Sequence, residues 1–267
     1  MMKRSLLSWA AAAALLLPGA VLAQSYGAFM PSGDFVLEIA GEEIPEAEFF
    51  RSTSVPSVLV MTPALPAPVL VVPGARRVET INVMKLSKQG DGILSLLPGA
   101  TLAPQGGFEI DGQSIRFTVE GKAVVLSPKP DLLGAHEAAG LKEYSHLYVK
   151  GAKDYRPDAA TISRLKQQGQ PVKVKVFFGS WCPHCQRTVP GAVRVAEELA
   201  GSKIDFDFYG VKRGFGDDPE AKKADIDAVP TAVVYVNGRE AGRIEENDWN
   251  APERALSRIL SGGASGR

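Results

Sequence analysis

The sequence predicts an α/β domain in the C-terminal half of the chain, preceded by a separate, mostly-β domain. Two observations carry this prediction. Short β-like runs separated by proline and glycine occupy the chain up to about residue 130. After that point strand patterns alternate with helix patterns, as in α/β folds.

The first region, residues 24–130, contains apolar runs of strand length. Asp111-Gly112 is a strong hairpin signal between two of them. Five prolines between positions 56 and 73 indicate strand edges or corners. We predict a mostly-β domain whose role the residues do not reveal. The candidate strands are residues 35–39, 57–61, 69–72, 78–84, 108–110, 115–119 and 123–126.

The second region begins with residues 131–156, which we interpret as a helical linker because their pattern is helical but interrupted by glycine. The α/β domain is predicted over residues 157–262, and residues 263–267 look like a loose tail. Its expected strands are residues 172–178, 204–209, 232–236 and 240–245, and its helices begin near residues 157, 186, 218 and 252.

The first 23 residues look like an export signal. Lys3 and Arg4 precede an uncharged stretch rich in Leu and Ala, and residues 21–23 resemble a signal-peptidase site. The apolar stretch is shorter than the roughly 20 residues of a membrane-spanning helix. We therefore expect a periplasmic or secreted protein that starts near Gln24, without stable membrane insertion.

The charge balance argues against nucleic acid as a partner. The chain has 30 basic and 30 acidic residues. The predicted signal holds two of the basic ones and none of the acidic ones, which leaves a net charge of −2. A nearly neutral protein has no electrostatic attraction for nucleic acid or an anionic membrane.

Cys182 and Cys185 are the only two cysteines in the chain. A bond between thiols three residues apart closes a single tight turn, and such a bond is more often catalytic than structural. The pair lies between a predicted strand and a predicted helix. Free backbone N–H groups at a helix start stabilise negative charge, and the thiolate is the reactive form of cysteine.

Residues from about 157 to 262 resemble a thioredoxin-fold thiol–disulfide oxidoreductase domain. A Trp-Cys-x-x-Cys motif at residues 181–185 follows an apolar strand. Pro190 occupies the position of the proline that kinks the family's active-site helix, and Val229-Pro230 precedes the last hairpin as the family's cis-proline does. The resemblance implies a central mixed sheet flanked by helices.

The resemblance also implies roles for individual residues. Cys182 is the exposed attacking thiol, and Cys185 resolves the mixed disulfide. Pro183 and His184, the dipeptide found between the cysteines of DsbA, tune the thiolate.

Other positions are implied to bind the substrate or to set the redox behaviour. Trp181, Val229 and Pro230 line the substrate-binding surface. Val176 stands where thioredoxins bury an aspartate. A missing carboxylate, like a histidine between the cysteines, favours the oxidising end of the family.

Metal and haem sites are the other interpretations of the cysteine pair, and of these only Cu(I) binding stays open. Zinc normally requires four ligands, and the sequence has no second cysteine pair. Gln186 follows Cys185 where c-type haem attachment needs a histidine. Cu(I) binding by the two thiols is chemically possible. We interpret His136 and His146 as surface or packing residues.

We therefore expect an exported enzyme that exchanges disulfides with cysteine-containing proteins on the oxidising side, and that depends on a redox partner protein. No cofactor is expected beyond the Cys182–Cys185 disulfide, and no metal. A DsbC-like isomerase and a thioredoxin-like reductant are the alternatives within this chemistry. A Cu(I)-binding or redox-switch module is the alternative from another class.

Overall fold

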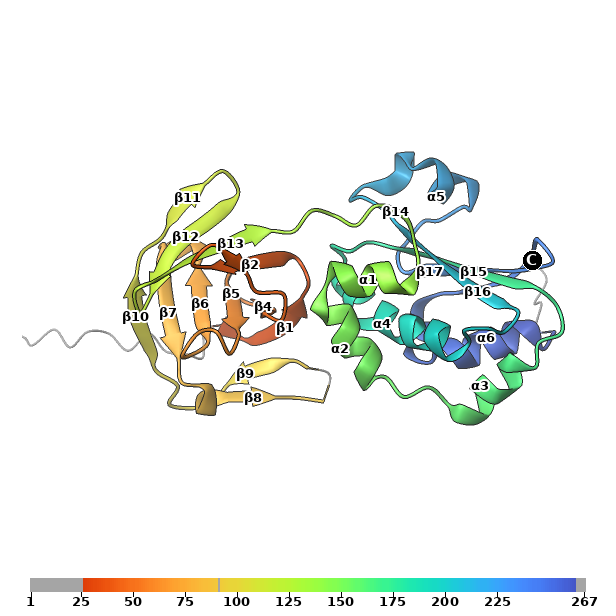
Figure 1. The fold of residues 1–267 in the computed structure, drawn as a ribbon, viewed down its shortest axis with the longest axis horizontal. Helices are drawn as coiled ribbons and strands as arrows, with labels where there is room; N and C mark the ends of the chain where they lie inside the picture. The colour runs from red at the N-terminus through yellow and green to blue at the C-terminus, as the bar shows by residue number, and fades with distance from the viewer. Residues whose placement is uncertain (1–25, 91, 263–267) are drawn as a thin grey trace, which may run out of the picture.

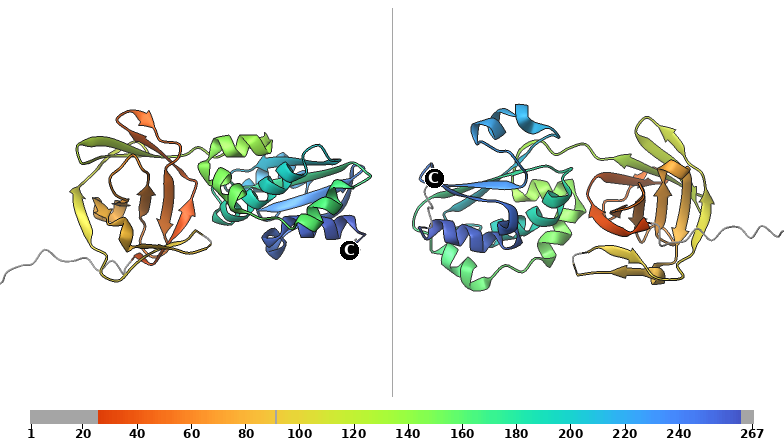
Figure 2. Two further views of the ribbon diagram at one scale, coloured as in Figure 1. Left: turned by 60° about the horizontal axis from the view of Figure 1, so that its bottom comes forward. Right: turned by 180° about the vertical axis from the view of Figure 1, so that it is seen from behind.

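The computed structural model describes residues 26–90 and 92–262. The predicted signal, residues 1–23, and the predicted tail, residues 263–267, lie outside the described residues. Two lobes lie side by side, a β lobe built from residues 28–128 and an α/β lobe built from residues 134–260 (Figures 1 and 2).

The β lobe consists of two antiparallel sheets. The eight-stranded sheet has the order β10 (Leu102–Gly106), β7 (Arg77–Ile81), β6 (Val69–Val72), β5 (Val58–Met61), β4 (Glu48–Ser52), β1 (Ala28–Ser32), β9 (Leu94–Leu96) and β8 (Leu86–Lys88). The five-stranded sheet has the order β11 (Glu109–Asp111), β12 (Ser114–Val119), β13 (Lys122–Pro128), β2 (Phe35–Ile39) and β3 (Glu42–Glu43). The mostly-β expectation for this region is therefore confirmed.

The apolar runs of the β lobe are buried on both sides of the large sheet. Val58 and Val60 face the core shared with the second sheet, whereas Leu59 between them faces a separate core. Burial on both faces explains why these strands read as continuous apolar runs rather than alternating ones. The run at 78–84 ends as a strand at Ile81, and a 3-10 turn, Val83–Lys85, follows it.

The α/β lobe has a mixed five-stranded sheet. Strands β15 and β16 are parallel, and the other neighbouring pairs are antiparallel. The sheet order is β14 (Gly134–His136), β16 (Ile204–Gly210), β15 (Val172–Phe178), β17 (Thr231–Val236) and β18 (Arg239–Ile244). A mixed central sheet is what the resemblance implied.

Helices cover both faces of this sheet (Figure 1). Short helix α5 (Pro219–Lys223) packs on one face, where its Ala221 joins Phe177 and Val233. The other face carries the main core and the helices α1 (Ala138–Tyr144), α2 (His146–Asp154), α3 (Ala159–Lys166), α4 (Pro183–Glu198) and α6 (Pro252–Leu260). Among residues 26–90 and 92–262, no helix is both long and apolar enough to cross a membrane.

The segment predicted as a helical linker, residues 131–156, is an integral part of the α/β lobe. Its strand β14 pairs with β16, and Leu141 and Tyr148 are buried in the main core. The Leu132 carbonyl oxygen is 1.9 Å from the position that a Cβ on Gly210 would occupy, so only glycine fits there. The linker interpretation was wrong. The glycines interrupt the helical pattern in the sequence, but the apolar side chains of this segment are nevertheless buried in the main core.

Two side chains of the α/β lobe, Gln186 and Lys150, make polar contacts with the β lobe. Gln186, at the start of α4, is buried; its Nε2 donates to Asp34 Oδ1 at 2.6 Å, and its Oε1 accepts from Gly33 N at 3.2 Å. Lys150 of α2 forms an ion pair with Glu48 of β4. The turn between β1 and β2 is thus held against the first turn of α4, beside the cysteines.

Candidate functional site

The two cysteines lie where the predicted strand-to-helix junction places them. Strand β15 ends at Phe178, and Cys182 is the N-cap residue of α4. The Cys182 sulfur accepts from the Cys185 backbone N–H at 3.5 Å, as a capping side chain does. Pro183 is the first helical residue, so the helix starts three residues earlier than the sequence indicated.

The two thiols differ in exposure. Cys182 keeps 9% of its surface exposed, whereas Cys185 is fully buried. Both are free thiols in this structure. The Cys185 sulfur accepts from Gly179 N at 3.4 Å. Cys182 is thus the less buried of the two, but it is not the exposed thiol that the resemblance implied, because its side chain packs in the main core.

The thiols also differ in acidity. The pKa of Cys182 is lowered to about 6. The largest cause is a hydrogen bond from the Cys185 side chain; burial opposes it, and the backbone N–H groups of Cys185 and His184 and the His184 imidazole act in the same direction as the hydrogen bond. Burial, together with the interaction with Cys182, raises the pKa of Cys185. At neutral pH the pair is thus one thiolate and one thiol.

A second segment faces the reactive sulfur. The Cys182 thiol lies 3.7 Å from the Val229 carbonyl oxygen, which is its acceptor. The peptide bond between Val229 and Pro230 is cis, the isomer anticipated from the sequence. Trp249 Nε1 donates to the Pro230 carbonyl at 2.8 Å and holds this loop on the lobe. Val229 is partly exposed beside the sulfur, and Pro230 is buried.

Trp181 forms one wall of the site. It is half-buried, and its Nε1 donates to the Val211 carbonyl at 2.9 Å. The Arg213 guanidinium lies over its ring, 4.8 Å from the centroid. Arg213 and Trp181 lie 32 positions apart, so the sequence alone does not indicate that they meet.

Val176 occupies the main core beneath the site and is fully buried. An aliphatic side chain therefore stands where the resemblance expects a carboxylate. Asp205 and Asp207 lie on the strand β16, where Asp207 pairs with Lys173 at 3.3 Å, which fits a polar face of the sheet.

The contacts of His136 and the cleft position of His146 do not involve the two cysteines. His136 Nε2 is 3.0 Å from the Leu133 carbonyl in its own turn. His146 starts α2 and lines a cleft between the lobes. Within residues 26–90 and 92–262, no three His, Cys, Asp or Glu side chains gather in a way that suits a metal ion.

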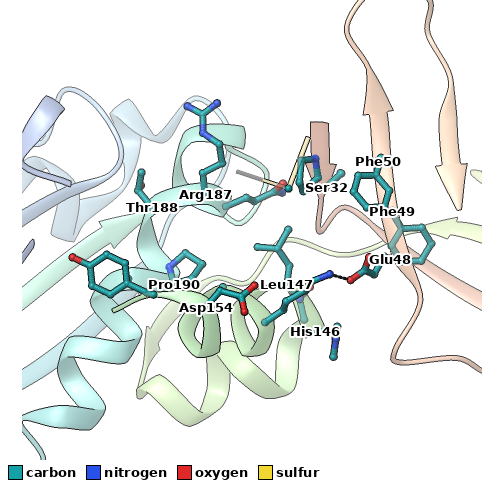
Figure 3. Close-up of a pocket in the computed structure, with 18 of the residues that line it drawn as sticks. Ser32, Glu48, Phe49, Phe50, His146, Leu147, Asp154, Arg187, Thr188 and Pro190 are labelled. Atoms are coloured by element: carbon teal, nitrogen blue, oxygen red, sulfur yellow. Dashed lines mark hydrogen bonds and ion pairs between the residues drawn. The ribbon is translucent and has the colours of Figure 1, made fainter. Parts of the chain in front are cut away.

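The cleft between the lobes has a volume of about 400 Å³ (Figure 3). Its walls come from β4, α2 and the part of α4 that follows the cysteines, and neither cysteine lines it. Phe49, Pro190 and Trp249 supply apolar surface, and Glu48 reaches toward α2 at one side. The sequence did not predict it, because its walls are brought together only by the docking of the lobes.

Comparison with known proteins agrees with this geometry. The sequence profile of the Thioredoxin family matches residues 159–259. This part of the chain is a thioredoxin domain. The strand β14 and helices α1 and α2, which complete its sheet and core here, precede the matched range.

Three thioredoxins are similar to this domain. Thioredoxin-2 of Saccharomyces cerevisiae is 27% identical over 112 residues, which cover 41% of this chain and 93% of that protein. Thioredoxin Y, chloroplastic, of Oryza sativa subsp. japonica is 32% identical over 30% of this chain and 45% of its own length. Thioredoxin of Geodia cydonium is 38% identical over 28% of this chain and 66% of its own length.

The unequal acidity of the two thiols predicts the pH dependence of alkylation. The rate at which iodoacetamide modifies Cys182 in the reduced protein should rise with a midpoint near pH 6. An unperturbed cysteine ionises at about pH 8.5. Because a hydrogen bond to the thiolate favours the charged form, Cys185→Ala should move the midpoint upward.

A midpoint near 8.5 in the intact dithiol protein would contradict this account of the site. The same ionisation affects the reduced protein's stability. The pKa of Cys182 is lower in the folded than in the unfolded chain, so the thiolate's contribution is present above the unfolded value and is lost as the pH falls through about 6.

Proposed function

We propose that this protein is an exported thiol–disulfide oxidoreductase that exchanges disulfides with protein substrates through Cys182 and Cys185. The observation that carries the proposal is that the two thiols differ in burial and in acidity. An acidic thiol that keeps 9% of its residue surface exposed and a fully buried, weakly acidic thiol share one helix turn. Thiol–disulfide exchange needs one good leaving group at the surface and one protected resolving group.

In the oxidising direction, a substrate thiolate attacks the Cys182 sulfur of the Cys182–Cys185 disulfide. The substrate–Cys182 bond forms, the bond to Cys185 breaks, and Cys185 leaves with the electron pair and then takes up a proton. A second substrate thiolate attacks the substrate sulfur of this mixed disulfide, and Cys182 leaves as a thiolate. Two electrons pass from the substrate dithiol to the protein.

The loop before β17 is the proposed platform for the substrate. An extended substrate segment can pair with the backbone at Val229 as an added strand, next to the reactive sulfur. The Val229 carbonyl lies within 3.7 Å of Cys182, so a strand bound there brings its cysteine close to the sulfur. Trp181, with Arg213 over it, adds an apolar and cationic wall.

The oxidising direction is supported by the stabilised thiolate. Whatever lowers the pKa of Cys182 favours the reduced protein, and so makes the disulfide form a stronger oxidant. Val176 places no carboxylate beneath the pair to oppose the negative charge. A DsbC-like isomerase and a thioredoxin-like reductant use the same residues and differ in the potential at which the pair works.

Export is proposed from residues 1–23, whose charged start, apolar stretch and small residues are typical of a cleaved signal. The proposed site of action is the periplasm or the extracellular space, where disulfides persist. The partners are then cysteine-containing substrates and a protein that reoxidises the pair. Mass spectrometry of the protein from an export-competent host should find a chain that begins at Gln24; a chain retaining residues 1–23 would contradict export by this signal.

Trapping of mixed disulfides is the decisive test of the exchange activity. With Cys185→Ser, the resolving thiol is absent, so substrate proteins should remain covalently bound to Cys182 after acid quenching. Cys182→Ser is the matched control and should trap none, because it removes the reactive sulfur. Non-reducing electrophoresis followed by reduction measures both.

Equal trapping by both variants, or by neither, would refute the proposed exchange. Stoichiometric binding of Cu(I) by the reduced wild-type protein without any trapping would favour the Cu(I)-binding alternative instead.

A further inference from the structure

Tyr148 is a buried tyrosine whose hydroxyl has no hydrogen-bond partner among the described residues. The residue lies on α2 and keeps 1% of its surface exposed. Buried polar groups are hydrogen-bonded in the great majority of cases, because an unpaired one costs about 1–3 kcal/mol. An orphaned hydroxyl in a well-packed core therefore requires an explanation.

The hydroxyl belongs to the same core as the dithiol. Cys182, Cys185 and Tyr148 pack in one cluster, and α2 lies along α4 (Figure 1). The Tyr148 ring meets the Phe178 ring edge-on, with the centroids 6.3 Å apart. Phe178 immediately precedes Gly179, whose N–H already donates to the Cys185 sulfur.

The ionisable groups near the phenol, like its burial, raise its pKa. Burial keeps the pKa of Tyr148 well above its usual value, and the strongest charge effect on it comes from Cys185. Tyr144, Cys182 and Asp34 contribute smaller effects of the same sign. The phenol therefore stays protonated, and its O–H remains available as a hydrogen-bond donor.

We propose that the Tyr148 hydroxyl is a positioning hydrogen-bond donor that stabilises the Cys185 thiolate formed during disulfide exchange. In the dithiol form Cys185 carries its own proton and directs it toward Cys182. When a thiolate attacks Cys182 and the disulfide breaks, the buried Cys185 sulfur receives the electron pair. The Gly179 N–H and the Tyr148 O–H then both donate to it until it is protonated.

This arrangement deepens the proposed exchange function and rests on it. Donors fixed in advance around a developing charge lower the barrier without reorganising. The phenol is neutral, so it stabilises the buried thiolate of the transition state. In the stable disulfide and dithiol forms the Cys185 sulfur is uncharged, so the phenol has no Cys185 thiolate to stabilise. It should therefore change the rates in both directions and leave the equilibrium between them unchanged.

The test compares Tyr148→Phe with wild type in reactions with glutathione. Quenched samples resolved by mass spectrometry give the rate of opening of the oxidised protein by reduced glutathione, and the rate at which Cys185 resolves the glutathione adduct. We expect both rates to fall about tenfold, the value for one hydrogen bond to a charged group. The reduction potential and the thermal midpoint should not fall.

Tyr144→Phe is the matched control. Tyr144 lies on the preceding helix and its hydroxyl donates to the Pro130 carbonyl at 2.9 Å, so its loss removes a structural hydrogen bond near the same core. We expect this variant to lower the thermal midpoint and to keep the wild-type exchange rates.

Wild-type rates in Tyr148→Phe would overturn the proposal. So would a slowing matched by Tyr144→Phe and accompanied by lost stability, since that is the signature of a packing role. These outcomes are separable from failure of the proposed function. Glutathione exchange requires only the two cysteines, whereas the proposed function fails if the Cys185→Ser variant traps no protein substrates.

Discussion

The interaction between the Cys182 and Cys185 side chains at the start of α4 determines what this site can do. It makes Cys182 an acid with a pKa of about 6, and it is possible only because Cys185 is buried and keeps its proton. The helix start adds backbone donors to the same sulfur. This one contact depends on its surroundings. Strand β15 and the turn after it position the two cysteines, and the packed core beneath Cys185 keeps that residue buried.

The elements around the dithiol could be predicted from the sequence because their signals are local. Alternating valine and lysine indicate β15, and the Asn237-Gly238 turn defines the last hairpin. The helix after the cysteines is also predicted, but from residue 186 rather than from Pro183. The two cysteines are three residues apart, so their proximity needed no knowledge of the fold. The cis bond before Pro230 was anticipated from the position of that proline in the thioredoxin pattern.

What the sequence could not predict depends on contacts between distant residues. Gln186 and Asp34 lie 152 positions apart, and nothing in either neighbourhood indicates that a turn of the β lobe meets the active-site helix. Tyr148 was assigned to a linker, because its burial follows from the packing of α2 along α4. The local sequence around Tyr148, with Leu147 before it and Val149 after it, gives no sign that its hydroxyl will lack a partner.

The polar contact between the lobes gives the β lobe a physical connection to the site. Gln186 follows Cys185 directly and binds both the β1–β2 turn and the Ser180 carbonyl at 2.6 Å. The ion pair of Asp34 with Arg51 at 2.9 Å fixes that turn from the other side. The β lobe is thus fastened to the segment that carries the dithiol, and its orientation relative to Cys182 is set by buried side chains.

The reduction potential of the Cys182–Cys185 couple, equilibrated against glutathione in the full-length mature protein, tests the central claim most directly. A stabilised Cys182 thiolate with no carboxylate beneath it predicts a value nearer to about −120 mV, the potential of DsbA, than to about −270 mV, that of thioredoxin. A value near −270 mV would contradict the account, because it would mean that the interaction between the two side chains does not favour the reduced form.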